Sequence, residues 1–492
     1  MSKKTKKITF LSLVIFIVGS TIGSGIFIKN TTILKYNGGN LIFTSISWAL
    51  ALIGFFALVL TLFEMCQGAK EENTNGIPGW CKTYNNNFIA KSAMSFTTWL
   101  YLPTSHFFMP IYCVDQLSSA MGWNIPWWLG LLISLIIFVY FILTSGRSAR
   151  ISVIQNYIIT YVKVLPLVFA CIIGFVALGT NQAVFDHSQI EKSASYFVNL
   201  APVIGISLSI PAIYFGFDGF FTATSLYEEV ENKSTFSKAM IVGTLIVTAI
   251  YLLCSISLIF LNVNGALEET PPLVTKGLSI FLNTCISISI FGVLNGCAYY
   301  GTIIFFDAIK NNEVPFAKRF KRQVSANNVK IGMYYSLAVY LIYFLVCSFI
   351  GIFYYSNYTN YGATDATGIT FGSLLTASDD FSNWTSLISF LFIAIAAMGC
   401  LKKRKNPESG IKKTWYFVPC CIVAFGFCVL CFGMVCVQTI FDLIYYLVND
   451  RNNPNVSLAS FIMPIVCLVS CVLGAIVPPL FMKKKGKVAL KH

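Results

Sequence analysis

The chain has 492 residues, of which 56% are hydrophobic and only 11% are charged. Soluble domains carry about 25% charged residues, so this composition excludes an ordinary soluble protein and indicates a chain embedded in a lipid bilayer. The formal net charge of +14 would otherwise suggest a nucleic-acid partner. We expect no such partner, because the basic residues lie in loops between apolar segments, as the positive-inside rule describes.

Apolar runs of about 20 residues, the length needed to cross a bilayer, divide the chain into twelve predicted membrane-spanning helices. The sequence therefore predicts an all-α polytopic membrane protein in which the whole chain forms one bundle. The expected spans are 8–29, 40–65, 92–120, 125–146, 152–179, 198–227, 238–263, 276–309, 331–356, 384–400, 414–443 and 457–482.

Basic residues alternate in abundance from loop to loop, and this alternation predicts the orientation. They are numerous in the tails 1–7 and 483–492 and in every second loop. The other set of loops, which includes 180–197, carries few of them: Lys29, Lys35, Lys192, Lys276 and Arg451. We therefore expect both termini in the cytoplasm and the loop 180–197 outside the cell.

The first span is interrupted by small residues, since residues 19–27 read Gly-Ser-Thr-Ile-Gly-Ser-Gly-Ile-Phe. Glycine costs about 1 kcal/mol relative to alanine inside a helix, and unwound backbone at membrane depth is tolerated only when it is buried in protein or lines a cavity. An unwound segment would expose the amides of Gly23, Ser24 and Gly25 to an anionic group. Close helix packing through Gly19 and Gly23 explains the same residues equally well.

Lys163 lies near the middle of the fifth span. An ionisable residue at this depth is costly and is a functional hypothesis by default. Because burial disfavours the charged form of lysine, a proton could be gained or lost here near neutral pH. The alternative is a structural lysine that binds the carbonyl groups of a broken neighbouring helix, and the two roles are compatible.

The sixth span repeats the irregularity of the first, because Pro211, Gly216, Asp218 and Gly219 interrupt an apolar helix. Two interrupted segments at matching places in two halves of a chain indicate a transporter built from inverted repeats. The binding site would lie between spans one and six.

These motifs, taken in order, resemble the amino acid–polyamine–organocation (APC) transporter superfamily over about residues 8–405. The most specific is the glycine stretch 19–27, which is similar to the first-helix motif of that family. The others are Glu64 with the Gly-rich turn 76–80, the fifth helix from Gln155 to Pro166, the segment 215–219 with the acidic stretch 228–232, and Asn295 through Asp307 to Pro315.

The resemblance implies a LeuT-like fold of two inverted five-helix repeats, residues 8–179 and 198–400, with broken helices one and six and two further helices in 401–482. It implies that the amides of Gly23, Ser24, Gly25 and Ile26 hold a substrate carboxylate. Carbonyl groups around Val18, Gly19 and Phe215 would meet the substrate ammonium group, and the Phe215 ring would cover the substrate. The remaining candidates for the substrate site are Ile22, Phe217 and Asp218.

In the same family, the position of Lys163 is where sodium-coupled relatives bind a sodium ion, which implies coupling to protons or exchange. We therefore expect a secondary transporter that moves amino acids across the cell membrane by alternating access, with protons as the coupling ion. An obligate exchanger, for example of the glutamate/γ-aminobutyrate type, and a polyamine permease are the alternatives within the class. A non-transporting amino acid sensor is the alternative outside it.

An enzyme is not expected, because the sequence offers no metal-ligand set and no nucleophile–base pair that can be placed together. No cofactor or metal is predicted. The sixteen cysteines lie in apolar runs, where a free cysteine behaves as a small hydrophobe. Oligomeric state is left open by the sequence.

Overall fold

The computed structural model describes residues 8–23, 25–68, 76–123, 125–181, 183, 195–200, 202–230, 233–260, 276–354, 371–405, 411, 413–451 and 458–486. Ser24, the tail 1–7, most of the loop 180–197 and residues 487–492 of the C-terminal tail lie outside these described residues.

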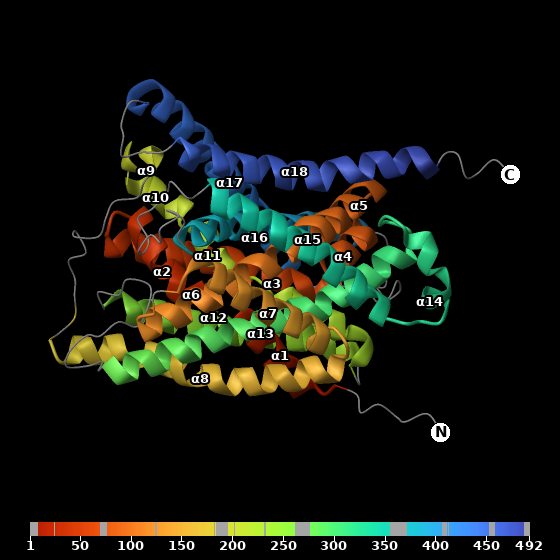
Figure 1. Cartoon of the computed structure of the whole chain (residues 1–492), viewed down its shortest axis with the longest axis horizontal. Helices are drawn as coiled ribbons and strands as arrows, with labels where there is room; N and C mark the ends of the chain where they lie inside the picture. The colour runs from red at the N-terminus through yellow and green to blue at the C-terminus, as the bar shows by residue number, and fades with distance from the viewer. Residues whose placement is uncertain are drawn as a thin grey trace.

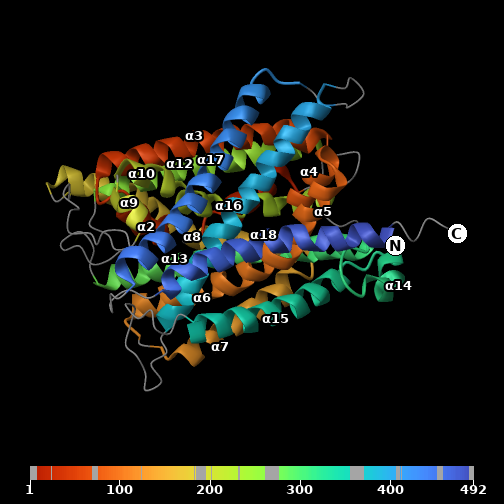
Figure 2. The ribbon, with the colours of Figure 1, turned by 90° about the horizontal axis from the view of Figure 1, so that it is seen from above.

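Long helices lie roughly side by side along the longest axis of the molecule (Figures 1 and 2). Eleven described segments are long and apolar enough to cross a membrane. The third predicted span is helical as well, because α5 (Asn87–Phe96), a π-helical turn (η2, Thr97–Tyr101) and α6 (Leu102–Met121) follow one another without a gap. Its buried polar side chains, among them His106 and Gln116, lower its hydropathy.

Two ends of the bundle are distinguished by short helices. In both views α4 (Ile77–Tyr84) and α14 (Lys321–Ser325) lie at one end, the α14 end, together with the last turns of α18 (Ala459–Gly486). The short helices α9 (Tyr196–Leu200) and α10 (Pro202–Leu208) lie at the opposite end, the α9 end.

The first span is broken into α1 (Phe10–Thr21) and α2 (Gly25–Tyr36). The sixth is interrupted twice, giving α10, α11 (Ile210–Phe217) and a 3₁₀ helix, η3 (Phe220–Glu229). Gly219 joins α11 to η3 with a φ of +97°, a conformation that L-residues with a side chain rarely adopt. Both breaks that the sequence predicts are therefore present.

Helices around the breaks are α8 (Ala149–Gly179), α12 (Lys233–Ile259), α13 (Lys276–Lys310) and α16 (Phe371–Lys403). The other helices complete the bundle: α3 (Leu41–Gly68), α7 (Trp127–Ser145), α15 (Lys330–Tyr354), α17 (Phe417–Tyr445), a π-helical turn η6 (Tyr446–Asp450) and a short 3₁₀ helix η4 (Ala317–Phe320).

The tenth span differs from its predicted limits, because α16 begins at Phe371 and not at residue 384. The polar stretch at its start has low hydropathy, yet it is compatible with a helix inside the protein. The Ser378 hydroxyl donates to the Leu374 carbonyl at 2.7 Å, and Asp379 forms an ion pair with Lys29. A bond within the helix and an ion pair with α2 thus accommodate a polar first part of α16, which hydropathy alone begins too late.

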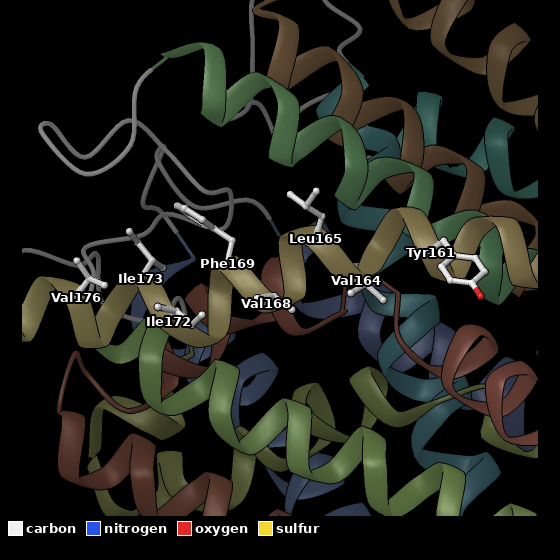
Figure 3. Close-up of a pocket in the computed structure, with 8 residues that line it drawn as sticks. All are labelled: Tyr161, Val164, Leu165, Val168, Phe169, Ile172, Ile173 and Val176. Atoms are coloured by element: carbon white, nitrogen blue, oxygen red, sulfur yellow. The ribbon is translucent and has the colours of Figure 1, made fainter. Parts of the chain in front are cut away.

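The outer face of α8 is apolar and exposed. A shallow groove follows it, lined by side chains of α8 alone, from Tyr161 to Val176 (Figure 3). Tyr161 is 75% exposed on this face. Such a surface is the one that a membrane-spanning helix presents to lipid chains, and it is separate from the two breaks inside the bundle.

Candidate substrate and coupling site

Lys163 is buried between the first break and α13. Its ammonium group donates to the carbonyl oxygens of Gly19 at 2.7 Å, Ile22 at 2.5 Å and Ser289 at 3.3 Å. Breaking a helix leaves carbonyl groups without their intrahelical donors, and an ammonium group supplies three donors at once. The structure therefore places Lys163 where the sequence analysis expected a lysine to support a broken helix.

Glycines at the first break are required by close contacts as well as by the break. A Cβ on Gly19 would lie 1.8 Å from the Asn156 side-chain oxygen, and one on Gly25 would lie 2.8 Å from the Gly216 Cα. Since real Cβ atoms essentially never come this close to other heavy atoms, a larger residue at Gly19 would displace the Asn156 side chain, and one at Gly25 would have to move the backbone of α11. The two explanations offered for this stretch, unwinding and close packing, are both correct.

The second break carries a buried carboxylate. Asp218 ends α11 and accepts hydrogen bonds from the Tyr101 hydroxyl at 2.9 Å, the Ser386 hydroxyl at 2.7 Å and the Gly219 amide at 2.9 Å. Tyr101 belongs to the π-helical turn η2, and Ser386 belongs to α16. Asp218 therefore ties the second break to two further helices through neutral donors.

Tyr251 of α12 is a site residue that the sequence analysis missed. Its hydroxyl donates to the Gly216 carbonyl at 2.7 Å and lies 3.5 Å from the Thr21 carbonyl oxygen, so it reaches both broken spans. Its ring packs against Phe217 with centroids 4.9 Å apart. The only signal in the sequence is a tyrosine within an apolar span, which by itself indicates nothing specific.

The carbonyl groups predicted to meet a substrate ammonium group already accept hydrogen bonds within the protein. The Val18 carbonyl accepts from the Ile22 amide at 3.0 Å, and the Phe215 carbonyl accepts from the Asp218 amide at 3.1 Å. The Gly19 carbonyl accepts from Lys163. A carbonyl oxygen has two lone pairs, so each retains capacity for one further donor.

Gly25 and Ile26 form the first turn of α2, next to the Gly216 backbone of α11. The first amides of a helix have no acceptor within that helix, and the helix dipole adds a partial positive charge there. Gly23 lies between α1 and α2 against Val293 of α13. The fold thus brings the predicted residues of spans one and six together.

On the α9 side of the breaks, Lys29 forms an ion pair that the sequence did not indicate, because Lys29 was the last residue of the first predicted span and was counted with the basic residues of the outside. Lys29 is 1% exposed, and its ammonium group lies 2.8 Å from an Asp379 carboxylate oxygen and 5.0 Å from the centre of the Phe215 ring. The Tyr112 hydroxyl donates to the same carboxylate oxygen at 2.5 Å. These four side chains join α2, α6, α11 and α16 next to the second break.

A second ion pair lies at the other ends of α3 and α16. The Glu64 carboxylate, which is buried, lies 2.9 Å from the Arg404 guanidinium nitrogen. Glu64 also accepts from the amide and the hydroxyl of Thr414, at 2.6 and 2.7 Å. Glu64, one of the residues that carry the family resemblance, is thus held in an ion pair next to the end of α16.

His106 is in aromatic packing. Its ring stacks on Tyr340 with centroids 4.3 Å apart, and its Nδ1 lies 2.7 Å from the Leu102 carbonyl oxygen. Among the described residues no group of three or more His, Cys, Asp or Glu side chains is placed to hold a metal ion.

Comparison with solved structures identifies the fold. The structure matches MhsT, solved in complex with L-phenylalanine, with a TM-score of 0.54, 13% sequence identity and coverage of 87% of this chain and 98% of that one. MhsT has the LeuT fold, so the predicted all-helical, LeuT-like fold is confirmed. At this level of identity the match establishes the fold alone.

The family is established by the sequence. Residues 8–467 match the amino acid permease family, and the chain belongs to this family of the APC superfamily. An uncharacterized protein of Mycoplasma pneumoniae is 29% identical over 473 residues, covering 86% of this chain and 83% of that protein. The serine/threonine exchanger SteT of Bacillus subtilis is 24% identical over 352 residues, which cover 69% of this chain and 77% of SteT. The chain is a multi-pass membrane transporter of amino acids and not an enzyme.

Proposed function

We propose that this permease moves a neutral amino acid by alternating access and that Lys163 links this movement to protons. The observation that carries the proposal is the contact of one ammonium group with three carbonyl oxygens on two elements, the first break and α13.

The substrate would bind between the two breaks. Its carboxylate would meet the first amides of α2, at Gly25 and Ile26, together with those of Gly23 and Ser24 before it. Its ammonium group would use the free lone pairs of the Val18, Gly19 and Phe215 carbonyls. Ile22, Phe217 and Asp218 would complete the site, and the Phe215 ring, beneath the Lys29–Asp379 ion pair, would cover it.

Proton coupling follows from the donor count of Lys163. The protonated amine has three N–H donors for three carbonyl acceptors, whereas the neutral amine has two donors and a lone pair that would face a carbonyl oxygen. Loss of the proton therefore weakens the link between the first break and α13. A ligand shifts a conformational equilibrium only through different affinities for the two states, and this link provides such a difference for a proton.

Exchange is the second candidate, and a relative favours it. SteT is named as a serine/threonine exchanger. An exchanger with the same site would reorient only when an amino acid is bound, and Lys163 would then be a permanent cation that stabilises the first break.

We further propose the cell membrane as the location, with both termini in the cytoplasm, as the distribution of lysine and arginine requires. The repeats would then be residues 8–179 and 198–400, the α14 end would face the cytoplasm, and the Lys29–Asp379 pair would lie towards the cell exterior.

The test is uptake of an amino acid panel that includes serine and threonine into proteoliposomes. Wild type and Lys163→Ala are compared with and without an imposed proton gradient, and with and without internal amino acid. Lys318→Ala, which changes an exposed lysine of η4, is the matched control.

Accumulation driven by the gradient in the wild type and the control, with exchange alone in Lys163→Ala, would support coupling through Lys163. Equal gradient-driven accumulation in all three proteins would remove Lys163 from the coupling mechanism. Uptake that requires internal amino acid in all three would replace the proton-coupled proposal with the exchanger.

A further inference from the structure

The contact between α8 and α12 joins the two helices that support the breaks, since α8 carries Lys163 and α12 carries Tyr251. The helices approach closely at Gly174, whose amide donates to the Ser257 hydroxyl at 2.9 Å. A Cβ on Gly174 would lie 1.7 Å from the Ser257 carbonyl oxygen. A small residue at such a contact lets two membrane helices approach closely.

One turn before this contact on each helix, Cys171 of α8 lies next to Cys254 of α12. The sulfur atoms of Cys171 and Cys254 are 3.3 Å apart. Each sulfur also reaches the opposite backbone, Cys171 at 3.9 Å from the Ile250 carbonyl oxygen and Cys254 at 3.8 Å from that of Leu167. A disulfide needs an S–S distance of about 2.05 Å, so the two sulfur atoms, already in contact, must come closer for a bond to form.

The two thiols differ in access. Cys254 is buried, whereas Cys171 is partly exposed. Phe169, Ile172 and Ile173, which flank Cys171 in sequence, line the apolar groove on the outer face of α8 (Figure 3). A small uncharged oxidant dissolved in the bilayer therefore reaches Cys171 first.

We propose that Cys171 and Cys254 form a thiol–disulfide site at which a hydroperoxide links α8 to α12 and stops transport reversibly. In the first step the Cys171 sulfur takes one oxygen from the hydroperoxide ROOH, giving a sulfenic acid and the alcohol ROH. In the second step the Cys254 sulfur attacks the Cys171 sulfur and the S–S bond forms. The hydroxyl group of the sulfenic acid and the proton of the Cys254 thiol leave together as water. A dithiol reductant restores both thiols by exchange.

Transport stops because the link acts on both breaks. Lys163 lies two helical turns before Cys171, and Tyr251 lies one turn before Cys254. Alternating access requires the broken spans to move relative to the helices that hold them. A covalent bond between α8 and α12 restricts the movement of these two helices relative to each other. It therefore restricts the movement of Lys163 relative to Tyr251, and of each broken span relative to the helix that supports it.

The experiment treats proteoliposomes with tert-butyl hydroperoxide, a probe that enters the bilayer. Free thiols are then blocked with N-ethylmaleimide, and mass spectrometry of peptides measures the fraction of protein with a Cys171–Cys254 bond. Amino acid flux is measured on the same samples before and after dithiothreitol. The bond is detected chemically, so its failure to form is distinguishable from an error in the proposed coupling role of Lys163.

The test variant is Cys171→Ala with Cys254→Ala, and the matched control is Cys428→Ala with Cys431→Ala, which removes two buried thiols from α17. The single variant Cys254→Ala replaces the test variant if the latter is not monodisperse. We expect flux in wild type and control to fall in proportion to the linked fraction and to recover with dithiothreitol, and the test variant to keep its flux.

Three results would overturn the proposal. They are the absence of a Cys171–Cys254 bond while other cysteines are oxidised, full flux in a sample that is mostly linked, and an equal loss of flux in the test variant.

Discussion

The two broken spans reach the centre of the same bundle but are stabilised by different chemistry. At the first break, carbonyl oxygens of Gly19 and Ile22 accept from a cation, Lys163. At the second break, the Gly216 carbonyl accepts from the neutral hydroxyl of Tyr251, and the Asp218 carboxylate accepts from hydroxyls and an amide.

This difference lies in the group that donates to the backbone carbonyls of each break, a cation at the first and a neutral hydroxyl at the second. Lysine can lose a proton and with it one donor, whereas tyrosine and serine hydroxyls keep their protons near neutral pH. Under the proposed coupling role, loss of the Lys163 proton would loosen the first break, and the second break would provide a reference against which the first moves. The predictions below test this contrast, beginning with the largest expected effect.

Replacing Gly25 should abolish transport. In Gly25→Leu the new Cβ would lie 2.8 Å from the Gly216 Cα, and overpacking of this kind costs about 1–3 kcal/mol, sometimes more. The first break would shift away from α11, and the proposed substrate site between the two breaks would be lost. Uptake is measured in proteoliposomes after equal membrane insertion, with Gly426→Leu as the control, because a Cβ at Gly426 meets nothing within 4 Å. Full uptake in Gly25→Leu would remove the first break from the substrate site.

Removing the Lys163 ammonium group should destabilise the protein more than any change at the second break. Lys163→Met keeps an unbranched side chain that is one heavy atom shorter and leaves the three carbonyl groups without this donor, and an unsatisfied buried group costs about 1–3 kcal/mol. Thermal unfolding in detergent checks this, with exposed Lys318→Met as the control. A melting temperature equal to that of the control would show that water or another group replaces the ammonium group at no cost.

At Asp218 the nature of the substituted side chain should decide the effect. Asp218→Asn keeps one oxygen for Tyr101 and the Gly219 amide but cannot accept from Ser386 through its NH₂ group. Hydrogen bonds to a charged group contribute about 1.5–3 kcal/mol, so Asn should cost less than that and Ala more. Thermal unfolding of both variants measures which one is less stable. Equal losses of stability would contradict a stabilising role for the hydrogen bonds that join Asp218 to η2 and α16.

Tyr251→Phe should have the smallest effect. It removes one neutral hydrogen bond to the Gly216 carbonyl, worth about 0.5–1.5 kcal/mol, and leaves the ring packing against Phe217 intact. Tyr161→Phe, on the exposed face of α8, is the control for thermal unfolding and for the pH profile of uptake. A changed pH profile of uptake in Tyr251→Phe would mean that the second break also responds to protons. The proposed difference between the two breaks would then be wrong.

Much of the site follows from local sequence. Glycine, proline and charge are so unfavourable in a lipid-spanning helix that residues 19–27, Lys163 and the segment around Asp218 could be identified without coordinates. The matching places of the two interruptions also predicted the fold class, which the match to MhsT confirms. The proposed roles of individual site residues remain predictions.

Pairs of residues far apart in the chain could not be predicted. Lys29 and Asp379 are separated by 350 positions, and neither is unusual in its own segment. A hydropathy window averages over about 20 neighbours and contains nothing about a partner on another helix, so it ended the first span at Lys29 and began α16 too late. Tyr251 was missed for the same reason, because its role depends on a hydrogen bond to a carbonyl group in another part of the chain.

The sequence by itself determined that this is a helical membrane protein, where its helices break, and that a lysine is buried at membrane depth. These features are local, since they depend on the free energy of placing each residue type in lipid or in a helix. Only the tertiary structure decided that Lys163 binds the first break, that Asp218 is held by Tyr101 and Ser386, and that Tyr251 joins the two breaks. Hydrogen bonds act over about 3 Å, and only the packed fold brings atoms from distant parts of the chain within that distance.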